Sequence, residues 1–116
     1  MPTGYPIGKR RKNVRWRLPY GLWVCSDGRE VLFDRAYRPC VERQSTGEAK
    51  LADPNEWVEH RISQEHFYTD ATPEKQKMAV AKAKLAEWGI LEAALRHAEE
   101  EVRLTGDQPY PRTAHA

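Results

Sequence analysis

Apolar and polar residues alternate along the first part of the chain. Val14, Trp16 and Leu18 alternate with two arginines, which predicts a strand with its apolar side chains on one face. The runs LWVC and REVLFD then flank Ser26-Asp27-Gly28-Arg29. An Asp-Gly pair between two such runs is typical of a two-residue hairpin turn. This pattern predicts the start of an antiparallel β-meander.

A two-residue loop at Asp27-Gly28 would determine the register of this hairpin. It would place Val24 opposite Val31 and Trp23 opposite Leu32. We therefore expect Val24 and Val31 to be neighbours on the buried face, with Trp23 and Leu32 on the other face.

The second half of the chain has helical spacing. Asp53-Pro54-Asn55-Glu56 has the residues of a helix start, which predicts a short helix with Trp57 as an apolar anchor. Thr72-Pro73-Glu74 repeats this signal, and apolar residues then recur at intervals of three and four. The apolar stripe changes phase at Gly89-Ile90. We expect a break there and a final helix to about Leu104, with one unbroken helix as the alternative.

These elements predict a small α+β fold. An N-terminal antiparallel β-meander of three or four strands, with a third or fourth strand at about 37–43, would pack against C-terminal helices. A chain of 116 residues fits one domain, which we expect over 13–104. Residues 1–12 are expected to form a flexible basic arm and residues 105–116 an irregular tail.

Composition argues against several classes of protein. No stretch approaches the roughly 18 apolar residues of a membrane span. No apolar segment follows the basic N-terminus, as a secretory signal would require. Cys25 and Cys40 match no zinc-site spacing and are expected to be free thiols. We therefore expect a cytoplasmic protein with no membrane contact, bound metal or cofactor.

The net charge of +2 conceals an uneven distribution. Residues 53–74 carry six acids against one arginine, whereas residues 1–20 carry six cations and no acid. Cations replace phosphate counterions, and a neighbouring aromatic ring can stack on a base. The N-terminal cations therefore predict a site for DNA or RNA, made of Lys9, Arg10, Arg11, Lys12, Arg15 and Arg17. A solubilising arm that docks on the acidic segment is the alternative.

A second candidate surface would bind protein. If helices cover only one side of the sheet, Trp23 and Leu32 would form an apolar patch on the open side, rimmed by Arg29 and Arg35. The acidic segment, with Glu56 and Glu59, could imitate phosphates toward a nucleic-acid-binding enzyme. Trp57 and Trp88 are expected in the core instead.

Catalytic motifs are weak in this chain. Asp34 with Glu48 and Lys50 loosely matches the acidic residues and lysine of metal-dependent nucleases. Glu56 and His60 lie four residues apart, a spacing that could ligate a divalent metal. Matches of this length are weakly specific, so we expect a non-enzymatic protein without catalytic or metal-binding residues.

Four runs of sequence carry a resemblance over about residues 14–90: LPYGLWVCSDGREVLFDRAYRP, ADPNEWV, HFYTD and AEWGI. On these motifs the chain resembles a family of small proteins encoded in bacterial and prophage genomes, for which no activity is established. The resemblance implies a bacterial cytoplasm and a mobile-element context, and it transfers no catalytic residue.

These observations give two functional hypotheses. The first is a phage or mobile-element accessory protein that binds nucleic acid through its basic N-terminal segment. The alternative is a protein-binding inhibitor or adaptor directed at a host nucleic-acid enzyme or defence complex, in the manner of an anti-CRISPR protein. The sequence does not indicate an oligomeric state.

Overall fold

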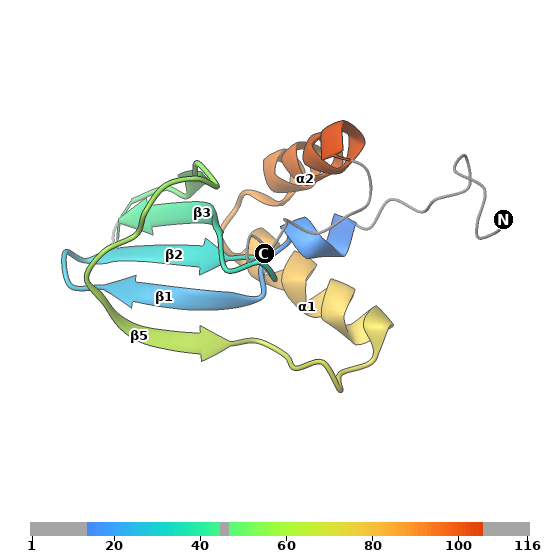
Figure 1. Ribbon diagram of the computed structural model, residues 1–116, viewed down its shortest axis with the longest axis horizontal. Helices are drawn as coiled ribbons and strands as arrows, with labels where there is room; N and C mark the ends of the chain where they lie inside the picture. Colours follow the sequence, from blue (N-terminus) through green and yellow to red (C-terminus); the bar gives the residue numbers. More distant parts are fainter. Residues whose placement is uncertain (1–13, 45–46, 106–116) are drawn as a thin grey trace, which may run out of the picture.

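The computed structural model describes residues 14–44 and 47–105. Within these ranges a 3₁₀ helix, five strands and two helices follow one another. They are η2 (Val14–Arg17), β1 (Gly21–Cys25), β2 (Arg29–Phe33), β3 (Pro39–Gln44), β4 (Lys50–Leu51), β5 (Arg61–His66), α1 (Glu74–Glu87) and α2 (Leu91–Thr105). The α+β class predicted from the sequence, with N-terminal antiparallel strands and C-terminal helices, is confirmed (Figure 1).

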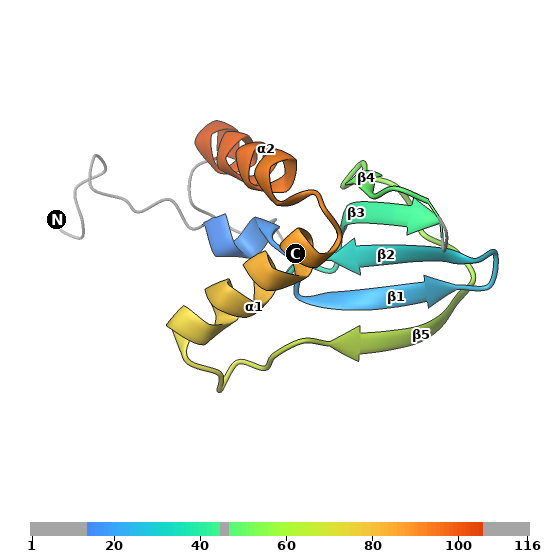
Figure 2. The same ribbon diagram turned by 180° about the vertical axis from the view of Figure 1, so that it is seen from behind.

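The strands form one antiparallel sheet in the order β4-β3-β2-β1-β5. Strands β1 and β2 are the predicted hairpin, and β3 is the strand predicted at about 37–43. Strands β4 and β5 are additional strands that the sequence did not predict. The chain must cross the whole sheet between β4 and β5, because these strands lie at opposite edges. This crossing segment, residues 52–60, passes over the side that faces the viewer in Figure 1, whereas Figure 2 shows the side nearer the helices.

The β1–β2 hairpin is present, but its loop has three residues instead of two. A type I′ turn needs positive φ at both of its central residues. In this loop only Gly28 has a positive φ, of 92°, and its N–H donates to Cys25 O at 3.0 Å. Asp27 Oδ1 accepts a hydrogen bond from Arg29 N–H at 3.0 Å instead of shaping a two-residue turn.

The longer loop shifts the pairing by one residue, so that Trp23 lies opposite Val31 and Val24 opposite Glu30. The predicted pairing of Val24 with Val31 is therefore wrong, since a one-residue slip moves side chains to the other face. Trp23 and Leu32, predicted to share an open face, belong to different core clusters and are 2% and 0% exposed.

A 3₁₀ turn, η2, takes the place of the strand predicted from Val14. Leu18 N–H donates to Arg15 O at 3.2 Å, which closes this turn. Arg17 and Leu18 lie three and four residues after Val14, which places all three on one side of a helical turn, and all three pack inward. The prediction of a strand from Val14 is therefore wrong, because a short helical turn also buries residues at these positions.

The two C-terminal helices begin and end close to where the sequence predicts. Helix α1 begins after Pro73, and the predicted break is confirmed at Gly89, whose φ of 74° is the left-handed conformation common after a helix end. Both helices and the sheet contribute to one core cluster, made of Leu18, Leu32, Val41, Ala81, Leu85, Trp88, Ala94 and Ala98.

The short helix predicted from Asp53 is not formed. Residues 53–56 make a turn in which Glu56 N–H donates to Asp53 O and Asn55 N–H to Asp53 Oδ1, each at 2.9 Å. Asp followed by Pro favours a turn as strongly as a helix start, because both use the side-chain oxygen to accept a backbone N–H.

None of the helices in 14–44 and 47–105 is long and apolar enough to cross a membrane. The predicted arm, residues 1–12, and all of the predicted tail except Thr105 lie outside the described residues. Thr105 itself is the last residue of α2.

Candidate protein-binding surface

The sheet has a second core cluster on the side away from the helices. It consists of Trp23, Cys25, Val31, Phe33 and Val58, the last from the crossing segment. We call this side of the sheet the helix-free face. The crossing segment covers the helix-free face only in part, so side chains at the two ends of this face remain in contact with solvent.

Five planar side chains form a stacked series on the helix-free face. The guanidinium of Arg61 lies 5.7 Å from the Trp57 ring centroid and 4.4 Å from that of Trp23. The Trp23 and Phe33 rings stack at 4.4 Å, and the Phe33 and Tyr37 rings at 5.1 Å. The two outer rings are exposed, Trp57 by 73% and Tyr37 by 46%, whereas the inner rings are buried. The buried Phe33 ring thus contacts Tyr37 directly, whereas the series reaches Trp57 through the exposed Arg61.

The β2–β3 turn determines the position of Tyr37. Its φ of 61° is the left-handed conformation, which costs a residue with a side chain about 1–2 kcal/mol. The Asp34 carboxylate is 1% exposed and stabilises this turn by accepting the N–H groups of Ala36 at 2.9 Å and Arg38 at 3.1 Å. Burial raises the pKa of Asp34 to about 7.

A second stacked group lies beside Tyr37. His66 stacks on Tyr20 with ring centroids 4.6 Å apart, and the Arg35 guanidinium lies 5.0 Å from Tyr20 and 4.9 Å from Trp16. The Tyr37 hydroxyl is 3.1 Å from His66 Nε2, within hydrogen-bonding distance. Both groups are therefore joined into one aromatic and arginine-rich surface.

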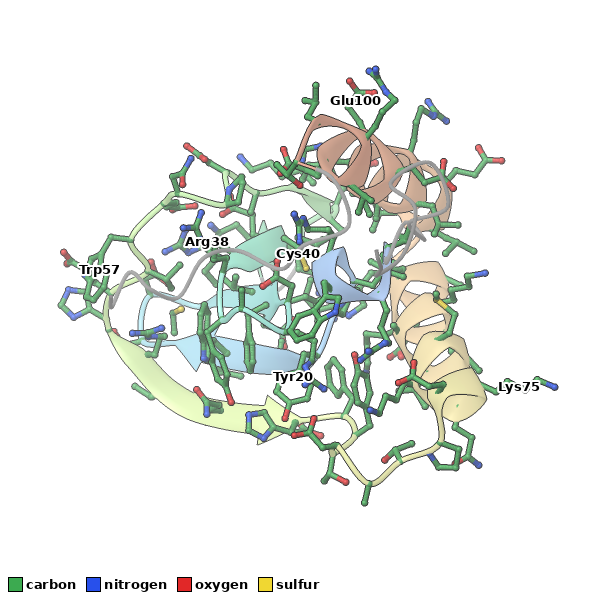
Figure 3. All side chains as sticks on the ribbon, turned by 45° about the vertical axis from the view of Figure 1, so that its right-hand side comes forward. Tyr20, Arg38, Cys40, Trp57, Lys75 and Glu100 are labelled. Carbon is green, nitrogen blue, oxygen red and sulfur yellow. The ribbon has the colours of Figure 1, made fainter. Side chains whose placement is uncertain are left out.

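Trp57 is the most exposed large apolar side chain among the described residues, and the prediction that it lies in the core is wrong. Burial alternates in the last part of the crossing segment: Glu56 is partly buried, Trp57 exposed, Val58 buried and Glu59 exposed. Val58 points to the sheet and is 3% exposed, which leaves Trp57 outward. Trp57 lies at the end of the sheet farthest from the helices (Figure 3). Trp88 is 7% exposed, as predicted.

An ion-pair network ties the crossing segment to the sheet. One nitrogen of Arg29, Nη1, lies 3.1 Å from Glu42 Oε1 and 2.8 Å from Glu56 Oε2. The hydrogen bond to Glu56 is the largest of the effects that raise the pKa of Arg29. Because the Arg29 side chain is only 16% exposed, this network anchors the crossing segment next to Trp57.

The predicted protein-binding residues do not lie together on one exposed patch. Trp23 and Leu32 are buried on opposite sides, so they form no exposed patch. Arg35 pairs with Asp70 at 2.7 Å. Glu59 is 61% exposed and lies near Trp57 in the sequence. The exposed part of the surface is thus centred on Trp57 and not on Trp23.

Two of the six predicted nucleic-acid-binding cations lie within the described residues. Arg15 Nε is 2.9 Å from Glu74 Oε1, which ties η2 to α1. Arg17 is 5% exposed and donates from Nη2 to Thr105 Oγ1 at 2.7 Å, which ties η2 to α2. The other four, Lys9 to Lys12, lie outside the described residues.

Two of the three residues of the weak nuclease match, Asp34 and Lys50, are engaged in other contacts. Asp34 is bonded to its own turn, and Lys50 Nζ lies 3.5 Å from Glu42 Oε2. Across 14–44 and 47–105 no three His, Cys, Asp or Glu side chains come together in a group that could hold a metal ion.

Tyr37 and Trp57 were missed as surface residues in the sequence analysis. One signal was available for Tyr37: the run Phe-Asp-Arg-Ala-Tyr-Arg at 33–38 combines aromatic and arginine residues with a turn-forming Asp. For Trp57 no comparable signal exists, because its exposure depends on the path of the crossing segment.

Comparison of the chain with protein-family models, with curated proteins and with solved structures finds no match. The resemblance drawn from the sequence motifs therefore stays a prediction.

Proposed function

We propose that the protein is a non-enzymatic binding protein that contacts a partner protein through Trp57 and the helix-free face around it. The observation that carries this proposal is the 73% exposure of an indole ring on an anchored segment. Trp, Tyr and Arg are the residues most enriched at the energetic centres of protein interfaces. Trp57, Tyr37 and Arg61 supply all three types within one stacked series.

Charge supports a partner with a basic surface. Residues 53–74 carry six acids against Arg61 alone. Arg15, Arg29 and Arg35, from outside this segment, pair with three of these acids, which are Glu74, Glu56 and Asp70. Glu59, two residues after Trp57, is 61% exposed, and its Oε1 lies 3.4 Å from His60 Nε2. A basic groove that normally holds nucleic acid fits this chemistry, which favours the inhibitor or adaptor hypothesis.

The test compares two variants that each remove an exposed apolar side chain. Partners captured by the wild-type protein are purified, and their dissociation constants are measured for wild type, Trp57→Ala and Leu104→Ala. Leu104 is 66% exposed on α2 and serves as the matched control. We expect Trp57→Ala to weaken binding by about 2 kcal/mol or more, roughly 30-fold, and Leu104→Ala to have no effect.

Binding should also weaken as salt concentration rises, because exposed charges are screened. Equal affinities of wild type and Trp57→Ala for every captured partner would refute the proposal. Both variants should have the same free energy of unfolding in urea as wild type, to within about 0.5 kcal/mol, because both side chains are exposed.

Nucleic-acid binding is the second candidate function, favoured by the six cations without an acid in residues 1–20. Arg15 and Arg17 contact Glu74 and Thr105, so this candidate rests on Lys9–Lys12. Fluorescence anisotropy of a labelled oligonucleotide should show a slope of log K against log salt of about −3 to −4 if these four cations contact duplex phosphates. Replacing the four by Ala should abolish the slope, whereas Trp57→Ala should not.

A further inference from the structure

Strand β5 is an open edge of the sheet. It is hydrogen-bonded to β1 on one side and is the last strand in the sheet order. All six of its residues are exposed, and no helix or strand of residues 14–44 and 47–105 lies along its outer side (Figure 1). An edge strand presents unpaired backbone N–H and C=O groups to any strand that can align with it.

The backbone pattern shows which groups of β5 point outward. Phe67 N–H donates to Tyr20 O at 2.9 Å, toward the β1 side. Successive residues of a strand point their backbone groups to opposite sides. Ser63 and Glu65 therefore face β1, and the backbone groups of Gln64 and His66 face the open side.

The two edges of the sheet differ in how far they are protected. Strand β4 is only two residues long, which limits any pairing along that edge. Strand β5 has six residues, without the proline or lysine that commonly block an edge. Its one irregularity is a register shift between the pairs of Val24 and Cys25 at its N-terminal end.

We propose that β5 pairs with β5 of a second copy of this chain, antiparallel and centred on Ser63. The strand is complementary to itself, because it has a cation near one end and an acid near the other. In the antiparallel arrangement the Arg61 end of each strand lies beside the Glu65 end of its partner. Ile62, which is 66% exposed in the single chain, would lie within the contact.

The contact uses the same patch on both copies and therefore forms a closed dimer. The contact continues the sheet from one copy into the other and covers the β5 edge of each copy. The contact does not involve Trp57, although Arg61 belongs both to it and to the stacked series on the helix-free face. Variants of Ile62 and of Trp57 therefore test the two proposals separately.

The first experiment measures molar mass by light scattering and sedimentation over a range of concentrations. We expect the wild-type protein to reach the mass of two chains, and Ile62→Lys to raise the dimer dissociation constant at least about tenfold. Leu104→Lys is the control, because Leu104 is exposed to the same extent but lies on α2. A wild-type monomer at every concentration, or equal effects of the two variants, would overturn the proposal.

The second experiment tests the register by cross-linking. A pair centred on Ser63 is non-hydrogen-bonded, with Cα atoms about 4.5 Å apart, which lies within the range for a disulfide. Ser63→Cys should therefore form a covalent dimer under mild oxidation, whereas Ala79→Cys, at an exposed position on α1, should not. Equal cross-linking of both variants would exclude this register.

Discussion

Gly21 lies directly against the ring of Phe33. A methyl group at Gly21 would come within 2.4 Å of Phe33 Cζ and 2.3 Å of Glu65 O. Because β1 is hydrogen-bonded to both β2 and β5, relieving this clash would require β1 to shift against its neighbours and disturb their pairing. We therefore expect Gly21→Ala to lower the free energy of unfolding by about 2–3 kcal/mol, as measured in urea.

The control for this prediction is Gly47→Ala. A methyl group there would meet Gln44 Cβ at 3.4 Å, close to ordinary contact, so the expected change is within about 0.5 kcal/mol. A Gly21→Ala protein as stable as Gly47→Ala would show that β1, β2 and β5 do not pack as described.

The helical stripes predict graded losses of stability. Leu85 is 0% exposed in the core between α1 and the sheet, whereas Leu95 on α2 is only partly buried. Leu85→Ala should cost about 2–5 kcal/mol, and Leu95→Ala should cost less, because the removed atoms are partly hydrated in the folded state. Urea unfolding of both variants checks this order, and the reverse order would contradict the assignment of the core.

Asp34 makes stability depend on pH. Its pKa is raised by burial from 3.8 to about 7, so between these values the folded protein binds a proton that the unfolded chain releases. Protonation of Asp34 therefore stabilises the folded protein. This contribution to the free energy of unfolding is complete below pH 3.8 and is lost as pH rises through 7, at up to about 1.4 kcal/mol per pH unit.

The measurement is the stability difference between wild type and Asp34→Asn at a series of pH values. The amide cannot ionise but keeps an oxygen that can accept the N–H of Ala36. The variant should gain stability relative to wild type as pH rises from 4 to 8. A pH-independent difference would mean that the carboxyl group is not desolvated.

Cys25 and Cys40 should react slowly in the folded protein. Burial raises the pKa of both thiols, and Cys40 Sγ donates to Leu32 O at 3.2 Å. The thiolate is the reactive form, so alkylation at pH 8 should be at least about tenfold slower in the folded state than in urea. Equal rates in the two states would place the thiols at the surface.

The fold was predictable where one local signal determines one local structure. The hairpin was found from Asp27-Gly28, and the helix break was found from Gly89. The hairpin register was not, because the same Asp-Gly pair serves two-residue and three-residue loops, and a difference of one residue reverses the faces of both strands.

The candidate surface was harder to predict, because it depends on contacts between distant segments. Trp57 has the sequence context of a helix anchor, and only the path of the crossing segment leaves it exposed. All residues of strand β5 are exposed, so its sequence has no alternation of apolar and polar residues. Its formation depends on pairing with β1, which is distant in the sequence. Arg15 and Arg17 resemble free cations in sequence but contact Glu74 and Thr105.

The crossing segment also imposes an order on the assembly of the sheet during synthesis. Trp23 Nε1 donates to Gln64 Oε1 across 41 residues of sequence, so β1 gains its second neighbour only after four strands have left the ribosome. Until then β1 is itself an edge, and Val58 does not yet cover the helix-free face. Closing so long a loop is slow compared with forming a hairpin. A nascent chain that ends before residue 61 therefore exposes Trp23 and an unpaired strand, which is the state most prone to aggregation.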